Sequence, residues 1–457
     1  MLNWIWLGLV LAAVAIAGIT GQIPETTKAA FDACENAVMK LALPLAGIFT
    51  LWLGIMRLAE KAGLINVIAV ALRPVMRWLF PDVPPTHPAM GAMVMNMAAN
   101  MLGLGNAATP LGLRAMQHLE RLNPRPGTAT NAMCTFLAIN TSSIQLIPAT
   151  TVAILAAKGA TDPTSIIGAA FMATVCSTAV GIFSVKTLEK LPAFALPPAP
   201  VVDREEPADS PAEENVILSP VSTFARIVLF IALAAFATVF ALMAYFPSTF
   251  ESVANFVRGL LATNLPPFGF APEWAGKHWL ARSVETISLL AIPFIVTMFP
   301  LYAAARRIPV YEEFIEGAKE GFQTAIRIIP YLVAILVAVG MFRAAGGINL
   351  LSTIFGKIFS YLHFPVELLP LVFMRPLSGS GSNAIFADLV TAHGPDALIT
   401  KMGATILGST ETTFYVLAVY FGSVAIRRTR HAVAAGLLAD LAGVIASIAI
   451  CNFLFNR

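Results

Sequence analysis

Long apolar runs are the feature of this sequence that most constrains its fold. About nine of them lie between residues 2 and 455, among them 39–57 and 326–345, and each has the roughly 20 residues that a helix needs to cross a bilayer. The first run, 2–19, lacks a positively charged start, so we expect a retained helix rather than a signal peptide. Only 12% of the residues are charged, against about 25% in soluble proteins. The sequence predicts an all-α polytopic membrane protein with about nine full crossings of the lipid bilayer.

Residues 191–219 separate two halves of the chain. This stretch is rich in proline and charge and has no hydrophobic periodicity, which is typical of a solvated linker. We expect four parts in chain order, namely a first membrane repeat (1–190), a cytoplasmic linker (191–219), a joining helix with an extracytoplasmic insert (220–283) and a second membrane repeat (284–457).

The two halves share a pattern of interruptions. "NMLGLGNAATP" (100–110) matches "RPLSGSGSNA" (375–384), since both have two glycines one residue apart and then Asn-Ala. Further on, "FLAINTSSIQLIP" (136–148) parallels "ILGSTETTFYVLA" (406–418), a polar interruption within an apolar run. Each repeat is therefore expected to contain a spanning helix, an interfacial helix, a broken polar segment, a short amphipathic piece and two spanning helices.

The basic residues indicate how the repeats are oriented. "IRRTRH" (426–431) joins the last two apolar runs and should be cytoplasmic. The equivalent join in the first repeat, "AAKGATDP" (156–163), has one lysine and one aspartate, and we place it outside. With a cytoplasmic N-terminus and an extracytoplasmic C-terminus in the bacterial inner membrane, the two repeats are inverted. Inverted repeats with a broken segment in each are typical of transporters whose site lies at the midplane.

The broken segments are expected to form re-entrant hairpins with tips near 96–110 and 374–386. Non-helical backbone survives at membrane depth only where it is buried in protein or lines a wet cavity. Glycines let such a segment turn tightly and approach a solute closely. The alternative is that the small residues serve only close helix packing.

Polar residues of both broken segments form a candidate binding site for a small-molecule solute, because polar groups inside a membrane are costly and usually functional. Arg375 is expected to bind an anionic group, and Glu411 to couple to H⁺ or Na⁺, unless the two form a purely structural salt bridge. Asp440, in the last apolar run, is a weaker second carboxylate. The remaining site residues are Asn96, Asn100, Gly103, Gly105, Asn106, Asn140, Thr141, Ser142, Ser378, Gly379, Ser380, Gly381, Ser382, Asn383 and Thr412.

Other kinds of function find little support in the sequence. The four cysteines and six histidines are scattered, so we expect no metal site and no cofactor. The methionines of "AMGAMVMNMAANM" (89–101) could bind a soft metal, but they more often serve as pliable packing. Nucleotide-binding, metalloprotease and serine-hydrolase motifs are absent, and so is any sign of nucleic acid binding. We therefore do not expect an enzyme.

A family resemblance becomes visible at these motifs. Residues 1–190, with "FPDVPPTHPAMGAMVMNMAANMLGLGNAATP", closely resemble spore maturation protein A, and residues from about 284 onward, with "MRPLSGSGS" and "GSTETTFYVLAVYFGSV", closely resemble spore maturation protein B. The chain thus looks like a fused version of the two. Both belong to the nucleoside recognition or gate-domain group, which implies a role in membrane transport. A shared fold does not fix the substrate, so nucleosides do not follow from the resemblance.

Three hypotheses follow from the residues and the resemblance. The leading one is a secondary transporter or permease for a small polar or anionic solute, with its site at the midplane between two re-entrant hairpins. The second is a pore that conducts ions or metal. The third is a non-transporting assembly factor, in which the polar segments only lock two halves together. A homo-oligomer is compatible with all three.

Overall fold

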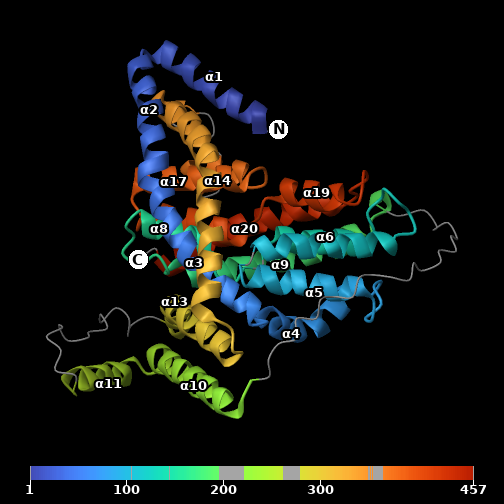
Figure 1. Cartoon of the computed structure of the whole chain (residues 1–457). Helices are drawn as coiled ribbons and strands as arrows, with labels where there is room; N and C mark the ends of the chain where they lie inside the picture. Colours follow the sequence, from blue (N-terminus) through green and yellow to red (C-terminus); the bar gives the residue numbers. More distant parts are fainter. Residues whose placement is uncertain are drawn as a thin grey trace.

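The computed structural model describes residues 2–103, 105–143, 145–194, 221–260, 278–347, 350, 353 and 364–455, without the side chains of 2–5, 105–107, 280, 281, 327, 328 and 331. Within these residues all regular structure is helical and no strand forms (Figure 1). The predicted all-α class is therefore confirmed. The predicted linker, 191–219, lies mostly outside the described residues, and so does 261–277 of the predicted insert.

The first half is a series of helices joined by short turns. Its elements are α1 (Leu2–Thr20), α2 (Ile23–Glu35), a π-helical stretch (Asn36–Ala42), α3 (Leu43–Lys61), α4 (Leu64–Leu79), α5 (Pro88–Met101), α6 (Gly105–Arg121), α7 (Asn131–Thr141), α8 (Ala149–Ala157), α9 (Ile166–Leu188) and a 3₁₀ turn (Pro192–Phe194). Two helices of the joining region follow, α10 (Thr223–Tyr245) and α11 (Pro247–Leu260).

The second half repeats the order of the first. Its elements are α13 (Trp279–Ala305), α14 (Val310–Ala344), a 3₁₀ turn (Val366–Leu368), α16 (Leu369–Met374), α17 (Gly379–His393), α18 (Leu398–Ser409), α19 (Thr413–Gly422) and α20 (Ala432–Phe455). The hairpin α16–α17 corresponds to α5–α6, the broken pair α18–α19 to α7–α8, and α20 to α9. The predicted internal repeat is thus present in the element order.

At one end of the molecule, the loop between α6 and α7 contacts the loop between α19 and α20. The amide of Ala129 donates to the carbonyl of Arg428 at 3.0 Å, and the amide of Arg428 donates to the carbonyl of Gly127 at 3.0 Å. The Nη1 group of Arg430 donates to Oδ1 of Asn131 at 2.7 Å. These contacts join the α6–α7 loop to the basic segment 426–431, which its charge predicts to be cytoplasmic.

The opposite end joins the loop between α8 and α9 to the loop between α17 and α18 (Figure 1). The hydroxyl of Thr161 donates to Oδ1 of Asp396 at 2.9 Å, and Nζ of Lys158 lies 3.0 Å from the hydroxyl of Thr391. The α6–α7 and α17–α18 loops are equivalent in the two halves, yet they lie at opposite ends. The two repeats are therefore antiparallel, as the inverted-repeat prediction requires.

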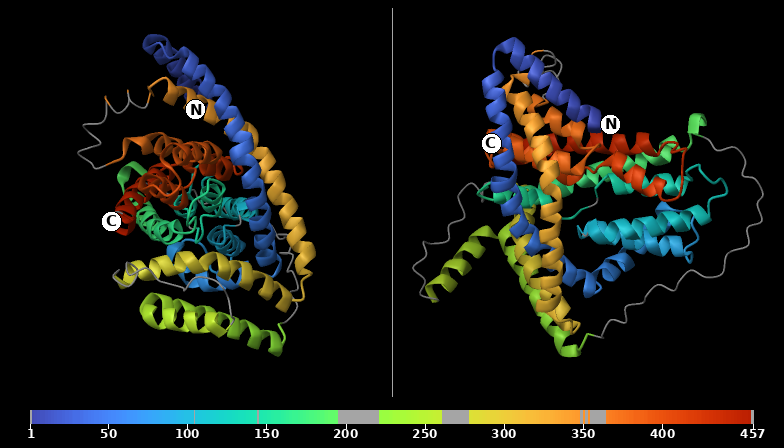
Figure 2. Two further views of the ribbon diagram at one scale, coloured as in Figure 1. Left: turned by 90° about the vertical axis from the view of Figure 1, so that its left-hand side faces the viewer. Right: turned by 45° about the horizontal axis from the view of Figure 1, so that its top comes forward.

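Two long helices form a closely packed pair along one side of the molecule (Figure 2). α2, the π-helical stretch and α3 form one continuous helix of 39 residues, and α14 has 35 residues. They approach through glycines, because a Cβ at Gly317 would lie 2.5 Å from the carbonyl oxygen of Leu53, and one at Gly321 would overlap the carbonyl oxygen of Phe49. Glycines four residues apart allow such backbone approach between membrane helices.

The two halves also share their hydrophobic cores. α19 packs on α6 and α7, and its Leu417, Tyr420 and Phe421 belong to the hydrophobic core of the first half. α8 packs mainly on α3 and also on α17 and α18, and its residues 152–155 belong to a second core to which both halves contribute. Both hydrophobic cores therefore contain residues of both halves, and this interlock brings the two broken segments together.

Five helices in the described part are long and apolar enough to cross a membrane. They are Ile23–Lys61, Ile166–Leu188, Thr223–Tyr245, Arg282–Ala305 and Ala432–Phe455. Their length and composition are those of a multi-pass membrane protein. The predicted number of nine crossings, the re-entrant placement of the hairpins and the sidedness of the termini stay predictions.

Candidate functional site

The turn of the first hairpin lies between α5 and α6. Gly103 adopts φ +73°, a left-handed conformation that glycine takes without steric penalty. The amide of Leu146, in the interruption between α7 and α8, donates to the carbonyl of Met101 at 3.0 Å. The hairpin turn is therefore hydrogen-bonded to the break between α7 and α8, which is the other interruption of the same repeat.

The turn of the second hairpin has the same relationship to its own broken pair. The amide of Phe414, at the start of α19, donates to the carbonyl of Pro376 at 2.9 Å. Ser378 caps α17, because its hydroxyl accepts from the amide of Gly381 at 3.1 Å. A Cβ at Gly379 would lie 3.1 Å from Oγ1 of Thr412, so a side chain there would crowd the break. Both hairpin turns thus lie against helix breaks.

The helix breaks leave backbone polar groups outside regular structure. α7 ends at Thr141 and α8 begins at Ala149, with Ser143 in a left-handed conformation at φ 52°. Such a conformation is uncommon for a residue other than glycine and often marks a functional segment. The hydroxyl of Ser143 lies 3.4 Å from the carbonyl oxygen of Gly408, so the two breaks meet each other across the halves.

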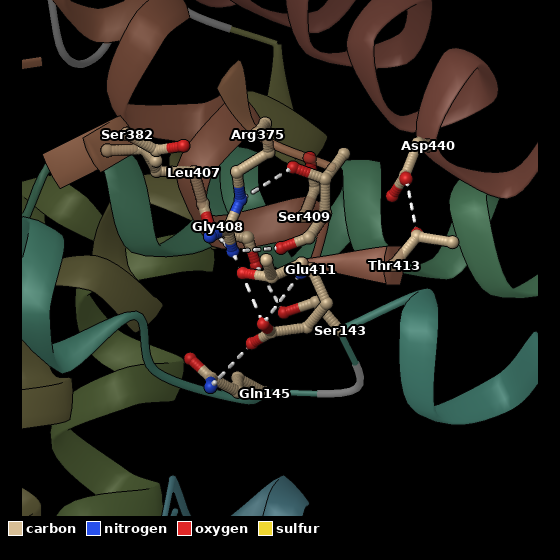
Figure 3. A network of polar contacts seen from close by, with 12 residues as sticks. Ser143, Gln145, Arg375, Ser382, Leu407, Gly408, Ser409, Glu411, Thr413 and Asp440 are labelled. Carbon is tan, nitrogen blue, oxygen red and sulfur yellow. Dashed lines mark hydrogen bonds and ion pairs between the residues drawn. The ribbon is translucent and has the colours of Figure 1, made fainter. Parts of the chain in front are cut away.

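Arg375 is the central side chain of this region (Figure 3). It is 7% exposed, and its Nε donates to the hydroxyl of Thr410 at 3.1 Å. Its Nη2 donates to the carbonyl of Leu407 at 3.1 Å and also to the carbonyl of Thr410. These carbonyls belong to the end of α18, where the helix has no further amides to satisfy them. The guanidinium therefore satisfies free carbonyl groups at the C-terminal end of α18.

Glu411 faces the same guanidinium from the break between α18 and α19. Its Oε2 lies 3.7 Å from Nη2 of Arg375, and it accepts from the amide of Thr412 at 3.1 Å. Its Oε1 lies 3.5 Å from Nε2 of Gln145, which comes from the other half. The carboxylate keeps 28% exposure. The predicted Arg375–Glu411 pair thus exists, as a loose ion pair with an open side.

A cluster of asparagines occupies the corresponding place in the first half. Nδ2 of Asn100 donates to Oδ1 of Asn140 at 2.9 Å and lies 3.4 Å from Oδ1 of Asn96. Nδ2 of Asn96 donates to the carbonyl of Ala108 at 2.7 Å and to the hydroxyl of Tyr420 at 3.3 Å. Within the described residues, no hydrogen bond links this cluster directly to Arg375 or Glu411. The structure therefore divides the predicted site into two clusters.

The other predicted residues have varied positions. Thr141 and Ser142 are buried, and their hydroxyls donate to the carbonyls of Ala138 and Ile139. Ser382 is buried and donates to the carbonyl of Ser378, which makes it part of the helix start. Ser380, whose hydroxyl lies 3.5 Å from that of Ser378, and Asn383 are half-buried on α17. Gly105 and Asn106 begin α6, and the side chain of Asn106 lies outside the described part.

Three contributors were not among the predicted site residues. Thr410 and Gln145 lie inside the polar interruptions, so the local pattern could have included them. Tyr420 reaches Asn96 only because α19 packs on the first half, and no local signal indicates that. In the described part of the chain, no three His, Cys, Asp or Glu side chains gather closely enough to hold a metal ion.

Comparison with known proteins identifies the family. The family model described as nucleoside recognition, named Gate, matches residues 42–158 and 325–427, which include the equivalent hairpins and breaks of both halves. Spore maturation protein B of Bacillus subtilis (strain 168) is 43% identical over 173 residues, or 38% of this chain and 97% of the relative. Spore maturation protein A of the same organism is 41% identical over 177 residues, or 39% of this chain and 90% of the relative.

Among solved structures, the chain is similar to the YdaH transporter of Alcanivorax borkumensis, described as having an unusual topology. The TM-score is 0.46 at 16% identity, with 92% of this chain and 87% of that chain covered. Each of the two relatives is matched over nearly its whole length. Each match takes up a similar share of this chain, 38% and 39%. The chain therefore belongs to the spore maturation protein A and B family of nucleoside recognition (Gate) membrane proteins, and it combines both members in one polypeptide.

Proposed function

We propose that the protein is a secondary transporter of the bacterial inner membrane for a small polar or anionic solute. The observation that carries this proposal is the buried guanidinium of Arg375 at a hairpin turn, beside a helix break. Its Nη1 group makes none of the hydrogen bonds that hold the side chain, and it lies 4.0 Å from where a Cβ of Gly379 would be. The two N–H donors of Nη1 therefore face Gly379, which has no side chain.

An anionic group is the chemistry that suits these donors. Arginine presents a planar fork that pairs with carboxylate or phosphate through two parallel hydrogen bonds. Glu411 already occupies one side, but at 3.7 Å it is too distant for a hydrogen bond. A solute carboxylate or phosphate could therefore displace it at small cost. The displaced Glu411 carboxylate would then be free to bind H⁺ or Na⁺, which gives it the coupling role.

A binding screen tests the proposal directly. The purified protein is melted in detergent with small carboxylates, phosphates, amino acids and nucleosides, because a ligand at 100 times its Kd stabilises the folded state by about 2.7 kcal/mol. We expect an anionic class to raise the melting temperature and Arg375→Gln to abolish the shift. Arg57→Gln is the matched control, since Arg57 also forms ion pairs, with Glu313 and Glu320, on the long helix pair.

One observation favours the assembly-factor alternative. The two breaks contact each other directly, at Ser143 and Gly408 and at Gln145 and Glu411, as a locking interface would. In a transporter the same contacts belong to a closed state that opens during the cycle. The alternatives differ at Glu411, because an assembly factor tolerates Glu411→Gln in every assay. If no anion shifts the melting temperature and Glu411→Gln is silent in flux assays, the transporter proposal is wrong.

A further inference from the structure

Asp440 is a second carboxylate at the centre of the molecule. It lies on α20 and is 5% exposed. Its Oδ2 accepts a hydrogen bond from the hydroxyl of Thr413 at 2.5 Å (Figure 3). In the described part of the chain, Oδ1 is buried and has no hydrogen-bond partner. A buried polar atom without a partner is rare in a folded protein and calls for an explanation.

The packing around Asp440 places it between the two helix breaks. Gly436 and Gly443 lie on either side of it along α20. A Cβ at Gly436 would lie 2.9 Å from Cγ2 of Thr413 and 3.1 Å from Oγ1 of Thr141, so the ends of both breaks press on this face. At Gly443, a Cβ would lie 3.0 Å from the carbonyl oxygen of Ser409. The carboxylate therefore occupies the seam where the two inverted repeats meet.

The Arg375–Glu411 pair lies beside this seam. Thr410 precedes Glu411 and accepts from Nε of Arg375, and its Cγ2 would lie 2.8 Å from a Cβ at Gly443 of α20. The helices that pack against α20 are α7, α9, α18 and α19. At this seam the side chains that they present are uncharged, namely Thr141, Ser177, Ser409 and Thr413.

The chemistry of this seam suits a proton better than a metal ion. Hard metal cations in proteins are held by several oxygen ligands that surround them. Asp440 has one hydroxyl partner, and the glycine contacts show that the backbone is too closely packed for a ligand shell. A proton needs only the carboxylate itself, and its uptake removes a charge that is expensive to bury. The Thr413 hydroxyl can accept as readily as it donates, so it can serve both forms.

We propose that Asp440 is a proton-binding site that works with the Arg375–Glu411 pair. The carboxylate takes up one proton from water and becomes a neutral acid, and release of that proton restores the charge. When Asp440 is ionised, its negative charge opposes the presence of a second anion, Glu411 or a solute, at the nearby guanidinium of Arg375. When it is neutral, Arg375 is left to Glu411 or to a bound anion. The use of Asp440 as a coupling site rests on the proposed transport function, whereas proton binding by Asp440 does not.

Infrared difference spectroscopy of the purified full-length protein tests this without any solute. Spectra recorded from acid to alkaline pH show a carbonyl stretching band for each carboxyl group that loses its proton. We expect one such band, from a buried acid, to be missing in Asp440→Asn and to remain in Glu411→Gln. Thr413→Val removes the hydrogen-bonding hydroxyl at nearly constant shape, so it should shift the frequency of that band and leave it present.

Each result decides the proposal. If the titrating bands are the same in Asp440→Asn and in the unmodified protein, Asp440 does not exchange a proton and the proposal is wrong. If added Na⁺ at constant pH removes the band, the bound ion is sodium and the proton assignment fails. If Asp440→Asn does not fold, the Thr413→Val frequency shift remains as the test, and no shift would overturn the proposal. If the solute screen fails but the band still depends on Asp440, the transport proposal is wrong and the proton-binding proposal stands.

Discussion

The hydrogen bond from Arg375 to Thr410 at the second hairpin is equivalent to the hydrogen bond from Asn100 to Asn140 at the first. Both contacts run from the residue at the hairpin turn to the last turn of the broken helix, with Nε of Arg375 3.1 Å from Oγ1 of Thr410 and Nδ2 of Asn100 2.9 Å from Oδ1 of Asn140. The repeats therefore share a geometry but differ in charge. Only the second repeat places a cation and a carboxylate at this position, so we expect it to determine the charge of the solute.

Removing Arg375 should destabilise the protein more than neutralising its ionic partner. Arg375→Gln leaves the buried carbonyls of Leu407 and Thr410 without their donor, and each unsatisfied group costs about 1–3 kcal/mol. Glu411→Gln removes an ion pair at 3.7 Å with a partly exposed carboxylate, worth about 1 kcal/mol or less. Chemical unfolding in detergent measures both free energies. Equal losses would show that the ion pair, not the helix end, holds the guanidinium.

The long helix pair should be sensitive to one added methyl group. Gly321→Ala places a Cβ on the carbonyl oxygen of Phe49, which forces the helices apart and should lower the free energy of unfolding by about 1–3 kcal/mol. Gly47→Ala, on the same pair, has no atom within 4 Å of its new Cβ and should be neutral or slightly stabilising. Thermal unfolding of both variants gives the comparison. Similar melting temperatures would mean that the pair is not closely packed.

The tyrosine hydroxyl at the asparagine cluster should make a small, specific contribution. Tyr420→Phe removes only the hydroxyl that accepts from Asn96 at 3.3 Å, and Asn96 keeps its bond to Ala108. The expected loss is about 1 kcal/mol in unfolding free energy. Tyr415→Phe is the control, because Tyr415 is 57% exposed on the same helix. A loss as large in the control would argue against the interlock of α19 with the first half.

Acid should weaken the end of the molecule where the α6–α7 and α19–α20 loops pair. Burial, together with the neighbouring positive charges of Arg430 and Lys186, lowers the pKa of His431 from 6.5 to about 4. Between these values the unfolded chain binds the proton and the folded protein does not, so stability falls as pH drops from about 6.5 towards 4. Melting temperatures across this range should fall less steeply in His431→Gln. The exposed His393 provides the matched control, and His393→Gln should keep the slope.

Much of the geometry of the candidate site could be predicted because its signals are local. Paired glycines followed by asparagine mark both hairpin turns, and polar residues inside apolar runs mark both breaks. Arg375 and Glu411 stand out because charges are rare in such runs. The interlock of α8 and α19 could not be predicted, because it depends on packing between residues more than 250 positions apart, such as Asn96 and Tyr420.

The long helices show a different limit of sequence reading. The apolar runs 39–57 and 326–345 predicted two spans of ordinary length, whereas the helices extend over Ile23–Lys61 and Val310–Ala344. Their polar ends carry charged residues that resemble loops in a hydropathy pattern. The two helices also pack on each other through glycine contacts such as that of Gly317 with Leu53, and a hydropathy pattern does not record such packing.

The sharing of both hydrophobic cores between the halves also bears on how the molecule is assembled. Because each core is built from residues of both halves, two separate polypeptides with these sequences would have to associate before either could finish folding. Their stability would then depend on the concentration of both. In a single chain the second half is always present at a high effective concentration. The covalent connection thus makes the association of the halves independent of protein concentration and fixes their ratio at one to one.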